Sequence, residues 1–233
     1  MEIKDKVAFV TGVSKGIGQA VVSQLLEKGA HVCGLGKTRP GYSHERFSFY
    51  ETNVRESGSV KRSVAEALAR HDGRVDILIN NAGLGYFGPL EEMPLEQWHE
   101  IFEVNVNGTF FTCRETIPVM KKHGRGHIIN VSSIAGLQGQ AQGAAYCGAK
   151  HAVRGISDSL FRELRDFNIK VTAIFPGSTK TNFFDNAQGI DAHDNMMMPE
   201  DVAGQILRII ETPDNFVINS LEFRPLQPRP AKK

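Results

Sequence analysis

A glycine-rich turn near the start of the chain has the residue types needed to bind phosphate. The segment Thr11-Gly12-Val13-Ser14-Lys15-Gly16-Ile17-Gly18 separates a short apolar run from a stretch of helical period. A helix N-terminus offers unpaired N–H groups, and glycines let the backbone approach a pyrophosphate. The turn therefore predicts a dinucleotide site, although its spacing, G-x3-G-x-G, departs from the usual G-x-G-x-x-G and also suits a plain tight turn. The predicted contacts are Gly12, Ser14, Lys15, Gly16, Ile17 and Gly18.

The end of the second apolar run indicates which dinucleotide binds. A carboxylate about 20 residues beyond the glycines would accept a hydrogen bond from the ribose 2′-hydroxyl of NAD. The segment Gly34-Leu35-Gly36-Lys37-Thr38-Arg39 has no such acid. Lys37 and Arg39 instead stand where a 2′-phosphate would lie, and Lys15 can reach the same place. One charge-assisted hydrogen bond contributes about 1.5–3 kcal/mol. We therefore expect NADP(H) as cofactor, with NAD(H) less favoured; the alternative is a solvated basic loop.

The elements that must position these residues follow from the hydrophobic pattern. Apolar runs of strand length alternate with segments of helical period, which predicts parallel strands joined by helical crossovers. The expected strands are residues 7–10, 32–35, 47–52, 75–79, 127–131, 169–175 and 216–221. The expected helices are residues 16–29, 60–69, 95–122, 145–167 and 199–211. The prediction is an α/β fold: a doubly wound, Rossmann-type sheet of about seven parallel strands with helices on both faces.

Length and composition limit the class of protein. The 233 residues predict a single domain over 1–233, since domains average about 150 residues. The net charge of +1 provides no overall positive field to hold a polyanion, so we do not expect nucleic acid as a partner. The 41% of hydrophobic residues is typical of a globular chain. Three scattered cysteines and eight scattered histidines predict neither disulfides nor a metal site. With no long apolar run or leader visible, we expect a cytoplasmic protein that does not cross a membrane.

Three further clusters give the chain a family likeness. Asn80-Asn81-Ala82-Gly83 follows the fourth expected strand, and Ser132-Ser133 follows the fifth. Tyr146-Cys147-Gly148-Ala149-Lys150 opens the next helix. Together with the glycine turn, these motifs resemble the short-chain dehydrogenase/reductase family from Lys4 to about Pro225. The resemblance implies hydride transfer between a nicotinamide dinucleotide and a small carbonyl or alcohol.

The resemblance assigns catalytic roles residue by residue. Tyr146 and Lys150 match the family's Y-x-x-x-K motif. The family's catalytic serine lies 13 positions before the tyrosine, which selects Ser133 over its neighbour. Asn105 matches the helical asparagine that completes the tetrad, and the resemblance implies that it orders a water leading from Lys150 to solvent.

The resemblance also implies further cofactor contacts. Asn53 and Val54 stand where the family often has Asp-Val beside the adenine, and an asparagine there is a departure from that pattern. Tyr146 and Lys150 would contact the cofactor as well, with Lys150 on the ribose hydroxyls. The remaining implied contacts are Asn81, Ala82, Gly83, Pro176, Gly177, Thr179 and Thr181.

Elementary chemistry supports the Tyr146 and Lys150 pairing. The two residues are four apart, so they share one face of a helix. A free phenol has a pKa of about 10, which is too high for a base at neutral pH. A nearby ammonium and the positive ring of an oxidised nicotinamide both favour the phenolate. Tyr146 can thus act as general acid in reduction, while Ser133 hydrogen-bonds the carbonyl oxygen as charge develops.

The stretch from 183 to 198 corresponds to a short substrate lid. Phe183, Phe184 and the run Met196-Met197-Met198 could close over an apolar substrate, or the methionines could simply pack the next helix. Tyr86, Phe87, Leu137 and Gln142 are further candidate wall residues, and Lys180 is a candidate partner for a substrate carboxylate. Residues 225–233 form a proline-rich basic tail, which is either extended or a subunit strap. The resemblance implies a homotetramer or homodimer.

The leading hypothesis is therefore an NADP(H)-dependent oxidoreductase that interconverts a carbonyl and a secondary alcohol. A narrower alternative is a reductase of 3-oxoacyl thioesters. An alternative of a different class is a non-catalytic NADP(H)-sensing regulator on the same fold.

Overall fold

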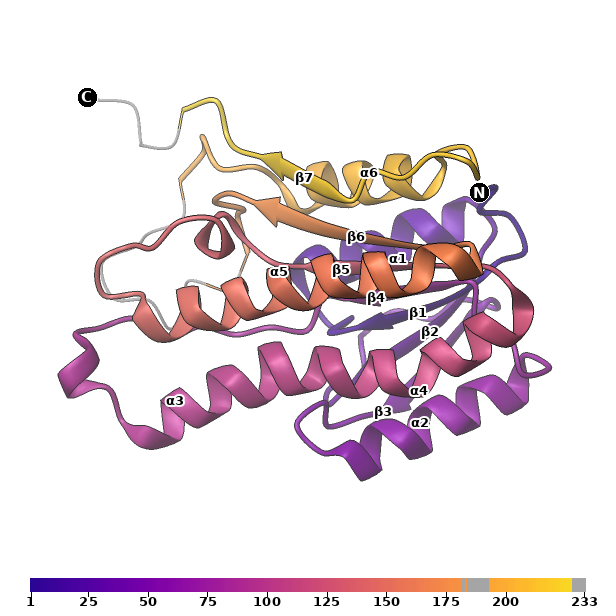
Figure 1. Ribbon diagram of the computed structural model, residues 1–233, viewed down its shortest axis with the longest axis horizontal. Helices are drawn as coiled ribbons and strands as arrows, with labels where there is room; N and C mark the ends of the chain where they lie inside the picture. Colours follow the sequence, from indigo (N-terminus) through magenta and orange to yellow (C-terminus); the bar gives the residue numbers. More distant parts are fainter. Residues whose placement is uncertain (182, 184–192, 228–233) are drawn as a thin grey trace.

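The computed structural model describes residues 1–181, 183 and 193–227. Within them, seven strands form one sheet in which every neighbouring pair is parallel, in the order β3-β2-β1-β4-β5-β6-β7 (Figure 1). This confirms the predicted doubly wound α/β fold. The strands are β1 (Val7–Thr11), β2 (His31–Gly36), β3 (Phe47–Glu51), β4 (Ile77–Asn80), β5 (Gly126–Val131), β6 (Ile169–Pro176) and β7 (Ser220–Phe223).

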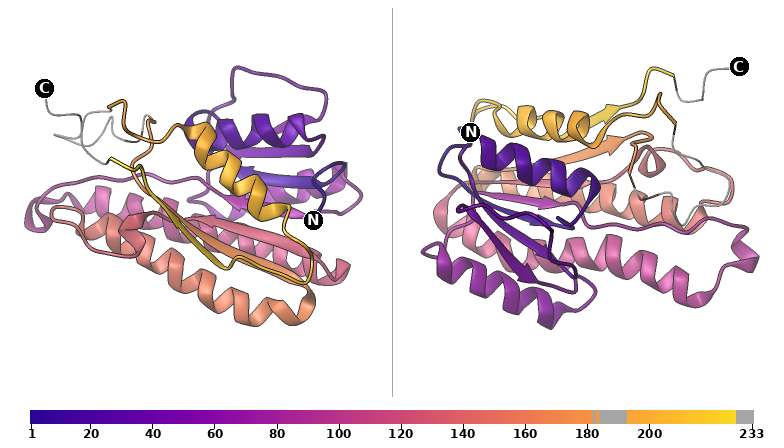
Figure 2. Two further views of the ribbon diagram at one scale, coloured as in Figure 1. Left: turned by 90° about the horizontal axis from the view of Figure 1, so that it is seen from above. Right: turned by 180° about the vertical axis from the view of Figure 1, so that it is seen from behind.

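Helices cover both faces of the sheet. One face carries α1 and α6, and the other carries α2, α4 and α5 (Figures 1 and 2). The long helices are α1 (Gly16–Glu27), α2 (Ser57–Arg70), α3 (Leu95–Phe102), α4 (Gly108–His123), α5 (Ala144–Leu164) and α6 (Pro199–Ile210). Short turns of helix are η1 (Leu90–Glu92), η2 (Glu103–Asn107), η3 (Ile134–Gly136) and η4 (Arg165–Phe167).

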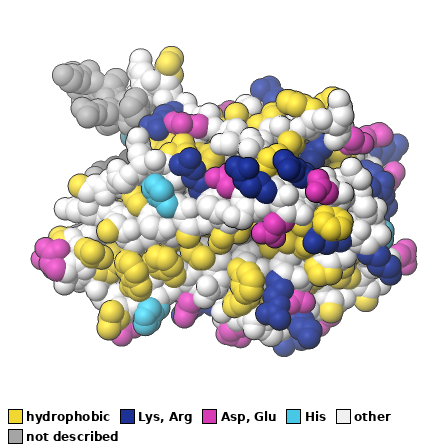
Figure 3. Space-filling view, in the orientation of Figure 1, with side chains coloured by type: hydrophobic (Ala, Val, Ile, Leu, Met, Phe, Trp, Pro, Cys, Tyr) yellow, Lys and Arg dark blue, Asp and Glu magenta, His cyan; other side chains and the backbone are white. Residues whose placement is uncertain are grey.

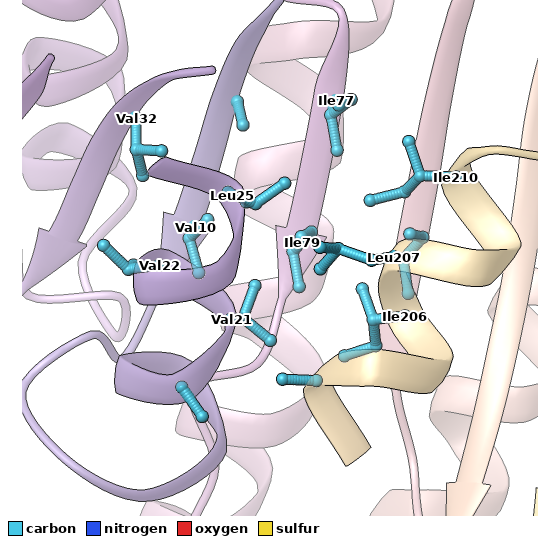
Figure 4. Packing of buried hydrophobic residues seen from close by; sticks show 14 of the residues in the cluster. Val10, Val21, Val22, Leu25, Val32, Ile77, Ile79, Ile206, Leu207 and Ile210 are labelled. Carbon is cyan, nitrogen blue, oxygen red and sulfur yellow. The ribbon is translucent and has the colours of Figure 1, made fainter. Parts of the chain in front are cut away.

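The alternation of side chains along β1 shows why both faces are apolar. Ala8 and Val10 point to the α1 and α6 layer, whereas Val7 and Phe9 join the core on the opposite face. All four are nearly inaccessible to solvent. On the first face, side chains of α1 and α6 meet above the sheet (Figure 4), with Ile206 among them. Burial on both faces explains the continuous apolar runs in the sequence.

The predicted helix over 95–122 is interrupted by one wide turn. Helix α3 passes through η2, a π-helical turn, and continues as α4, with helical backbone angles at both junctions. Asn105 lies inside this turn and is buried. A π turn inserts one extra residue into a helix and is frequent at functional sites.

The seventh strand begins later than the sequence pattern predicts. The expected strand covered 216–221, but β7 begins at Ser220. The Phe216 N–H donates to the Pro213 carbonyl at 3.1 Å, which closes a turn and leaves Phe216 about half exposed. The apolar residue therefore belongs to the turn before the strand.

Two predicted segments are only partly described. Residues 184–192 of the expected lid, including Phe184, and residues 228–233 of the tail lie outside the described residues. Met196 is buried, Met197 packs on the α1 and α6 core and pairs with Thr179, and Met198 is the N-cap residue of α6. The methionine run thus packs the next helix. Across the described ranges, no helix is long and apolar enough to cross a bilayer, and no three His, Cys, Asp or Glu residues gather as metal ligands.

Candidate active site

A cavity of about 510 Å³ opens at the carboxyl ends of the strands. The strand order reverses between β1 and β4, and ligands of doubly wound sheets bind in the crevice at such a switch point. Residues at and after the carboxyl ends of β1, β2, β3, β4, β5 and β6 form the cavity wall, together with residues of α3, η2 and α5. The predicted site residues in that wall are Gly12, Ser14, Lys15, Gly16, Ile17, Lys37, Val54, Asn81, Ala82, Gly83, Ser133, Tyr146, Lys150, Pro176, Gly177, Thr179 and Thr181.

The glycine turn is shaped by close backbone contacts. Gly12 has a φ of +70°, and a Cβ there would lie 2.9 Å from the Ala82 Cα. A Cβ on Gly18 would lie 2.1 Å from the Gly12 carbonyl oxygen, so Gly18 serves the turn's packing and is not in the cavity wall. In the described part of the chain, no side chain caps α1 and its first turn has no acid. The free N–H groups of α1 therefore suit a phosphate.

The turn is braced by the segment after β4. The Asn81 side-chain amide donates to the carbonyls of Thr11 and Gly12, both at 3.0 Å. The Thr11 hydroxyl in turn accepts from the backbone N–H groups of Asn81 and Ala82, at 3.0 and 2.9 Å. Sequence reasoning missed the role of Thr11, whose only signal is a hydroxyl at the end of a buried strand.

Two of the predicted cation contacts face the cavity and one does not. Lys15 and Lys37 are exposed and form part of its wall. Arg39 instead lies over the Phe49 ring, with its Cζ 5.1 Å from the ring centre. Asn53 also falls short of the wall, because its amide donates to Glu56 and its carbonyl oxygen accepts from the Arg55 N–H. The asparagine caps its own loop, which leaves Thr52 and Val54 as the wall residues there.

Tyr146 and Lys150 lie at the inner end of the cavity. Both are buried in the first turns of α5, as their spacing predicts. The Lys150 Nζ donates to the Val131 carbonyl at 3.0 Å and lies 5.7 Å from the centre of the Tyr146 ring. Burial away from water lowers the pKa of Lys150 to about 8.

Ser133 lies beside Tyr146 in the cavity wall. Burial raises the pKa of the Tyr146 phenol, and the hydrogen-bonding Ser133 side chain opposes that rise. Ser133 also caps η3, where its hydroxyl accepts from the Ala135 N–H at 3.1 Å. Its neighbour Ser132 points elsewhere and donates to the Lys150 carbonyl at 3.0 Å. Ser133, rather than Ser132, is therefore the serine that meets Tyr146.

Asn105 lies behind Lys150 and outside the cavity wall. Its amide donates to the carbonyls of Leu84 and Ile101, both at 2.8 Å. Its Oδ1 is buried and has no hydrogen-bond partner among the described residues. A Cβ on Gly83 would lie 2.8 Å from this Oδ1 and 3.3 Å from the Lys150 Nζ, so both polar atoms border the same small space. An unpaired buried acceptor beside a buried ammonium suits a bound water or ligand hydroxyl.

The cavity wall beside Tyr146 is aromatic. Phe87 and Phe183 line the cavity beside Tyr146, together with Gln140. Tyr86, Leu137 and Gln142 are not in the wall, and the Tyr86 hydroxyl donates to Glu100 at 2.8 Å. Lys180 is paired with Asp194 at 3.2 Å outside the cavity. Sequence reasoning missed Glu100 and Gln140, which have no local motif.

Comparison with known proteins shows the family. The model of the short chain dehydrogenase family matches residues 6–189, and the chain belongs to that family. An uncharacterized oxidoreductase of Staphylococcus saprophyticus is 34% identical over 239 residues, covering 96% of this chain and 97% of that protein. An uncharacterized oxidoreductase of Staphylococcus epidermidis is 29% identical, covering 97% and 99%. The chain is thus an oxidoreductase of this family, as the resemblance implies.

Solved structures show the same architecture. ElxO with NADP bound has a TM-score of 0.86 at 28% identity, covering 95% of this chain and 98% of that one. A serine dehydrogenase complexed with NADP+ has a TM-score of 0.85 at 26% identity, covering 93% and 94%. A 3-ketoacyl-(acyl-carrier-protein) reductase from Brucella melitensis complexed with NADH has a TM-score of 0.88, covering 97% and 100%, but at 24% identity it shows the fold alone.

Proposed function

We propose that this protein is an NADPH-dependent reductase of a small carbonyl compound, working reversibly on the corresponding alcohol. One observation carries the proposal. Ser133 and the buried Tyr146 and Lys150 lie in the same cavity as an uncapped helix N-terminus and two exposed lysines. A proton donor and a phosphate cradle are thereby held in one continuous space.

Several atoms of the cavity support a nicotinamide dinucleotide as its ligand. The free N–H groups of α1 suit the pyrophosphate, and Lys15 and Lys37 suit a 2′-phosphate. The unpaired Asn105 Oδ1 and the Lys150 ammonium border a space beside Gly83. When bound, the cofactor would supply the hydride. The NADP-bound relatives are consistent with this choice, while the NADH-bound structure shows that the fold itself does not decide it.

Burial of Tyr146 favours the protonated phenol in the protein without a bound substrate. Because burial raises its pKa, the phenol is protonated at neutral pH and can donate its proton to the carbonyl oxygen. The Ser133 hydroxyl would donate a hydrogen bond to the same oxygen as negative charge develops. Lys150 would stabilise the phenolate that remains, and a water held by Asn105 would return the proton from solvent. In the reverse direction, the same groups accept the proton from the alcohol.

Two measurements on the purified protein test the proposal. Titration calorimetry should show NADPH binding at least about tenfold more tightly than NADH, because of the lysine contacts. A panel of aldehydes and ketones with NADPH should then show turnover that Tyr146→Phe lowers about 10²- to 10⁴-fold while NADPH affinity stays within a few fold. Full activity in Tyr146→Phe would contradict the mechanism. NADPH binding without turnover of any carbonyl would favour a sensing role.

We further propose a dimer or tetramer. Hydrophobic side chains gather among the charged ones on the face covered by α4 and α5 (Figure 3). Phe110 of α4 is about half exposed, and exposed Leu95 and Trp98 lie on α3. Such exposed apolar groups are typical of an interaction surface. Light scattering after size-exclusion chromatography would contradict the proposal if it gave the 25.7 kDa mass of one chain.

A further inference from the structure

Three aromatic rings meet at the inner end of the cavity. The ring centres of Tyr146 and Phe183 are 5.2 Å apart, those of Tyr146 and Phe87 are 5.5 Å apart, and those of Phe87 and Phe183 are 6.2 Å apart. The rings come from α5, from the segment after β4 and from the segment after β6. The proposed proton donor is therefore flanked by two phenylalanines.

Gly85 makes this arrangement possible. A Cβ at position 85 would lie 2.7 Å from the Phe183 Cζ, 3.0 Å from the Tyr146 Cδ2 and 3.4 Å from the Phe87 Cε2. These distances are shorter than, or at the limit of, ordinary contact between carbon atoms. Any side chain at Gly85 would consequently push at least one ring out of the trio.

The remaining wall beside the rings is also uncharged. Ile134, Ala135 and Gln140 complete it, and Gln140 contributes an amide without charge. Glu100 also borders the cavity, but Arg55 donates to it at 3.1 Å and Tyr86 at 2.8 Å, so its charge is already paired.

The cations of the described cavity wall are assigned to partners other than a substrate anion. Lys150 lies 5.7 Å from the centre of the Tyr146 ring, and the proposed function uses it for the Tyr146 phenolate and the cofactor ribose. Lys180 is paired with Asp194 outside the cavity. Lys15 and Lys37 lie by the glycine turn and the end of β2, which is the proposed cofactor end. A carboxylate or phosphate on the substrate would therefore lose its water near the rings without gaining a cation.

We propose that Phe87 and Phe183 select substrates whose carbonyl is attached to a planar, uncharged apolar group, such as an aryl ring, and that Gly85 sets the position of this wall. The inference rests on the proposed function and names its substrate class. A planar group can stack on a phenylalanine ring while its carbonyl oxygen reaches the Tyr146 hydroxyl. A charged group at the same place is rejected because it would be desolvated and unpaired.

The test compares three aldehydes with NADPH as reductant: benzaldehyde, 4-carboxybenzaldehyde and propanal. For the unaltered protein, kcat/KM for benzaldehyde should exceed that for 4-carboxybenzaldehyde by about tenfold or more. Phe183→Ala should lower kcat/KM for benzaldehyde about two- to tenfold, the worth of one aromatic pair, and change propanal by less than twofold. Gly85→Ala should also lower kcat/KM for benzaldehyde more than kcat/KM for propanal. Phe216→Leu, at an exposed ring before β7, is the matched control and should leave both values unchanged.

Several outcomes would overturn the inference. Equal or better turnover of 4-carboxybenzaldehyde would show that charge is accepted. An unchanged ratio of benzaldehyde to propanal in both Phe183→Ala and Gly85→Ala would show that the rings do not select. Either result would leave the proposed reductase activity standing. Reduction of other carbonyls in the panel but of none of these three aldehydes would overturn the inference alone. Turnover of no carbonyl at all by protein that binds NADPH would remove the proposed function, and the inference with it.

Discussion

Two buried lysines at opposite ends of the sheet differ in how many of their N–H donors have an acceptor in the protein. Lys170, near the start of β6, donates to the Thr212 carbonyl and hydroxyl, both at 3.1 Å, and to the Pro213 carbonyl at 2.5 Å. Lys150 lies in α5 beside the last residue of β5, and within the described residues it donates only to the Val131 carbonyl, at 3.0 Å. Burial lowers the pKa of both side chains. Since a lysine carries three N–H donors, Lys170 is saturated by the protein and Lys150 is not.

The difference shows how burial alone fails to identify a site. Both lysine side chains are less than a tenth exposed. Lys170 uses its N–H donors to connect β6 to the segment after α6, whereas Lys150 has N–H donors without an acceptor among the described residues and lies in the cavity wall beside Tyr146. The unpaired Oδ1 of Asn105 lies beside the same cavity end. Unsatisfied polar atoms around a buried charge are costly unless a ligand completes them. Those spare groups, and not the charge, distinguish the candidate active site.

The largest expected effect comes from removing the unsaturated lysine. Lys150→Met should lower kcat for carbonyl reduction about 10²- to 10⁴-fold, because the phenolate left after proton transfer loses its cation. The thermal midpoint should fall less than in Lys170→Met, since only the Val131 carbonyl loses its donor and methionine fills the same space without a buried charge. Steady-state kinetics and calorimetry on the same preparation check both values. A variant that loses its fold along with its activity would place Lys150 in the same class as Lys170.

The saturated lysine should give the reverse result. Lys170→Met leaves the carbonyls of Thr212 and Pro213 without their donor, which we expect to cost about 2–3 kcal/mol. For a chain of this length, that corresponds to a fall of roughly 4–12 °C in the thermal midpoint. The value of kcat measured well below the midpoint should stay within twofold. A large loss of kcat with an unchanged midpoint would break the contrast between the two ends.

Lys37 and Arg39 form a matched pair of cations for mutation, because only Lys37 lies in the cavity wall at the proposed cofactor end. Lys37→Glu should reduce the preference for NADPH over NADH by roughly ten- to a hundredfold, because it replaces a charge-assisted hydrogen bond of about 1.5–3 kcal/mol by repulsion. Arg39→Glu should leave that preference nearly unchanged, since Arg39 lies over Phe49 and not in the cavity wall. The ratio of the two dissociation constants is the measurement. An effect of Arg39→Glu as large as that of Lys37→Glu would show that both face the 2′-phosphate.

Local patterns were sufficient for much of this molecule. Apolar runs with helical segments between them predicted the seven parallel strands, and motif spacing brought Ser133, Tyr146 and Lys150 to one cavity. Each of these features is written in neighbouring residues or in fixed offsets. The wide helical turn at Asn105 carries no such pattern, and the Asn105 side chain inside it donates to the backbone carbonyl of Leu84 in another segment.

Long-range contacts explain what the sequence did not reveal. The meeting of Phe87 and Phe183 over Tyr146 joins three segments, and its requirement for Gly85 is visible only once the rings are placed. Asn53 is a second example of a contact that the sequence did not predict. It stands at a cofactor position of the family, but its side chain hydrogen-bonds the neighbouring residues Arg55 and Glu56. Residue type alone cannot say which of two available partners a side chain will take.

The smallest expected effect is a decrease in the free energy of unfolding at low pH, caused by His127. This residue lies in β5 at the same end of the sheet as Lys170. Its Nε2 lies 2.9 Å from the Thr172 hydroxyl, and burial, with Lys170 nearby, lowers its pKa from 6.5 to about 3. Below pH 6.5 the unfolded chain therefore binds a proton that the folded chain does not, so stability is complete above pH 6.5 and falls toward pH 3. The expected loss in the free energy of unfolding is about 1.4 kcal/mol for each unit of pH in that window.

Urea unfolding at pH 7, 6 and 5 measures this loss. The free energy of unfolding should decline less steeply in His127→Gln, and as steeply as in the unaltered protein in His99→Gln, where the residue is exposed. Equal slopes in all three proteins would mean that His127 is not held neutral by the core.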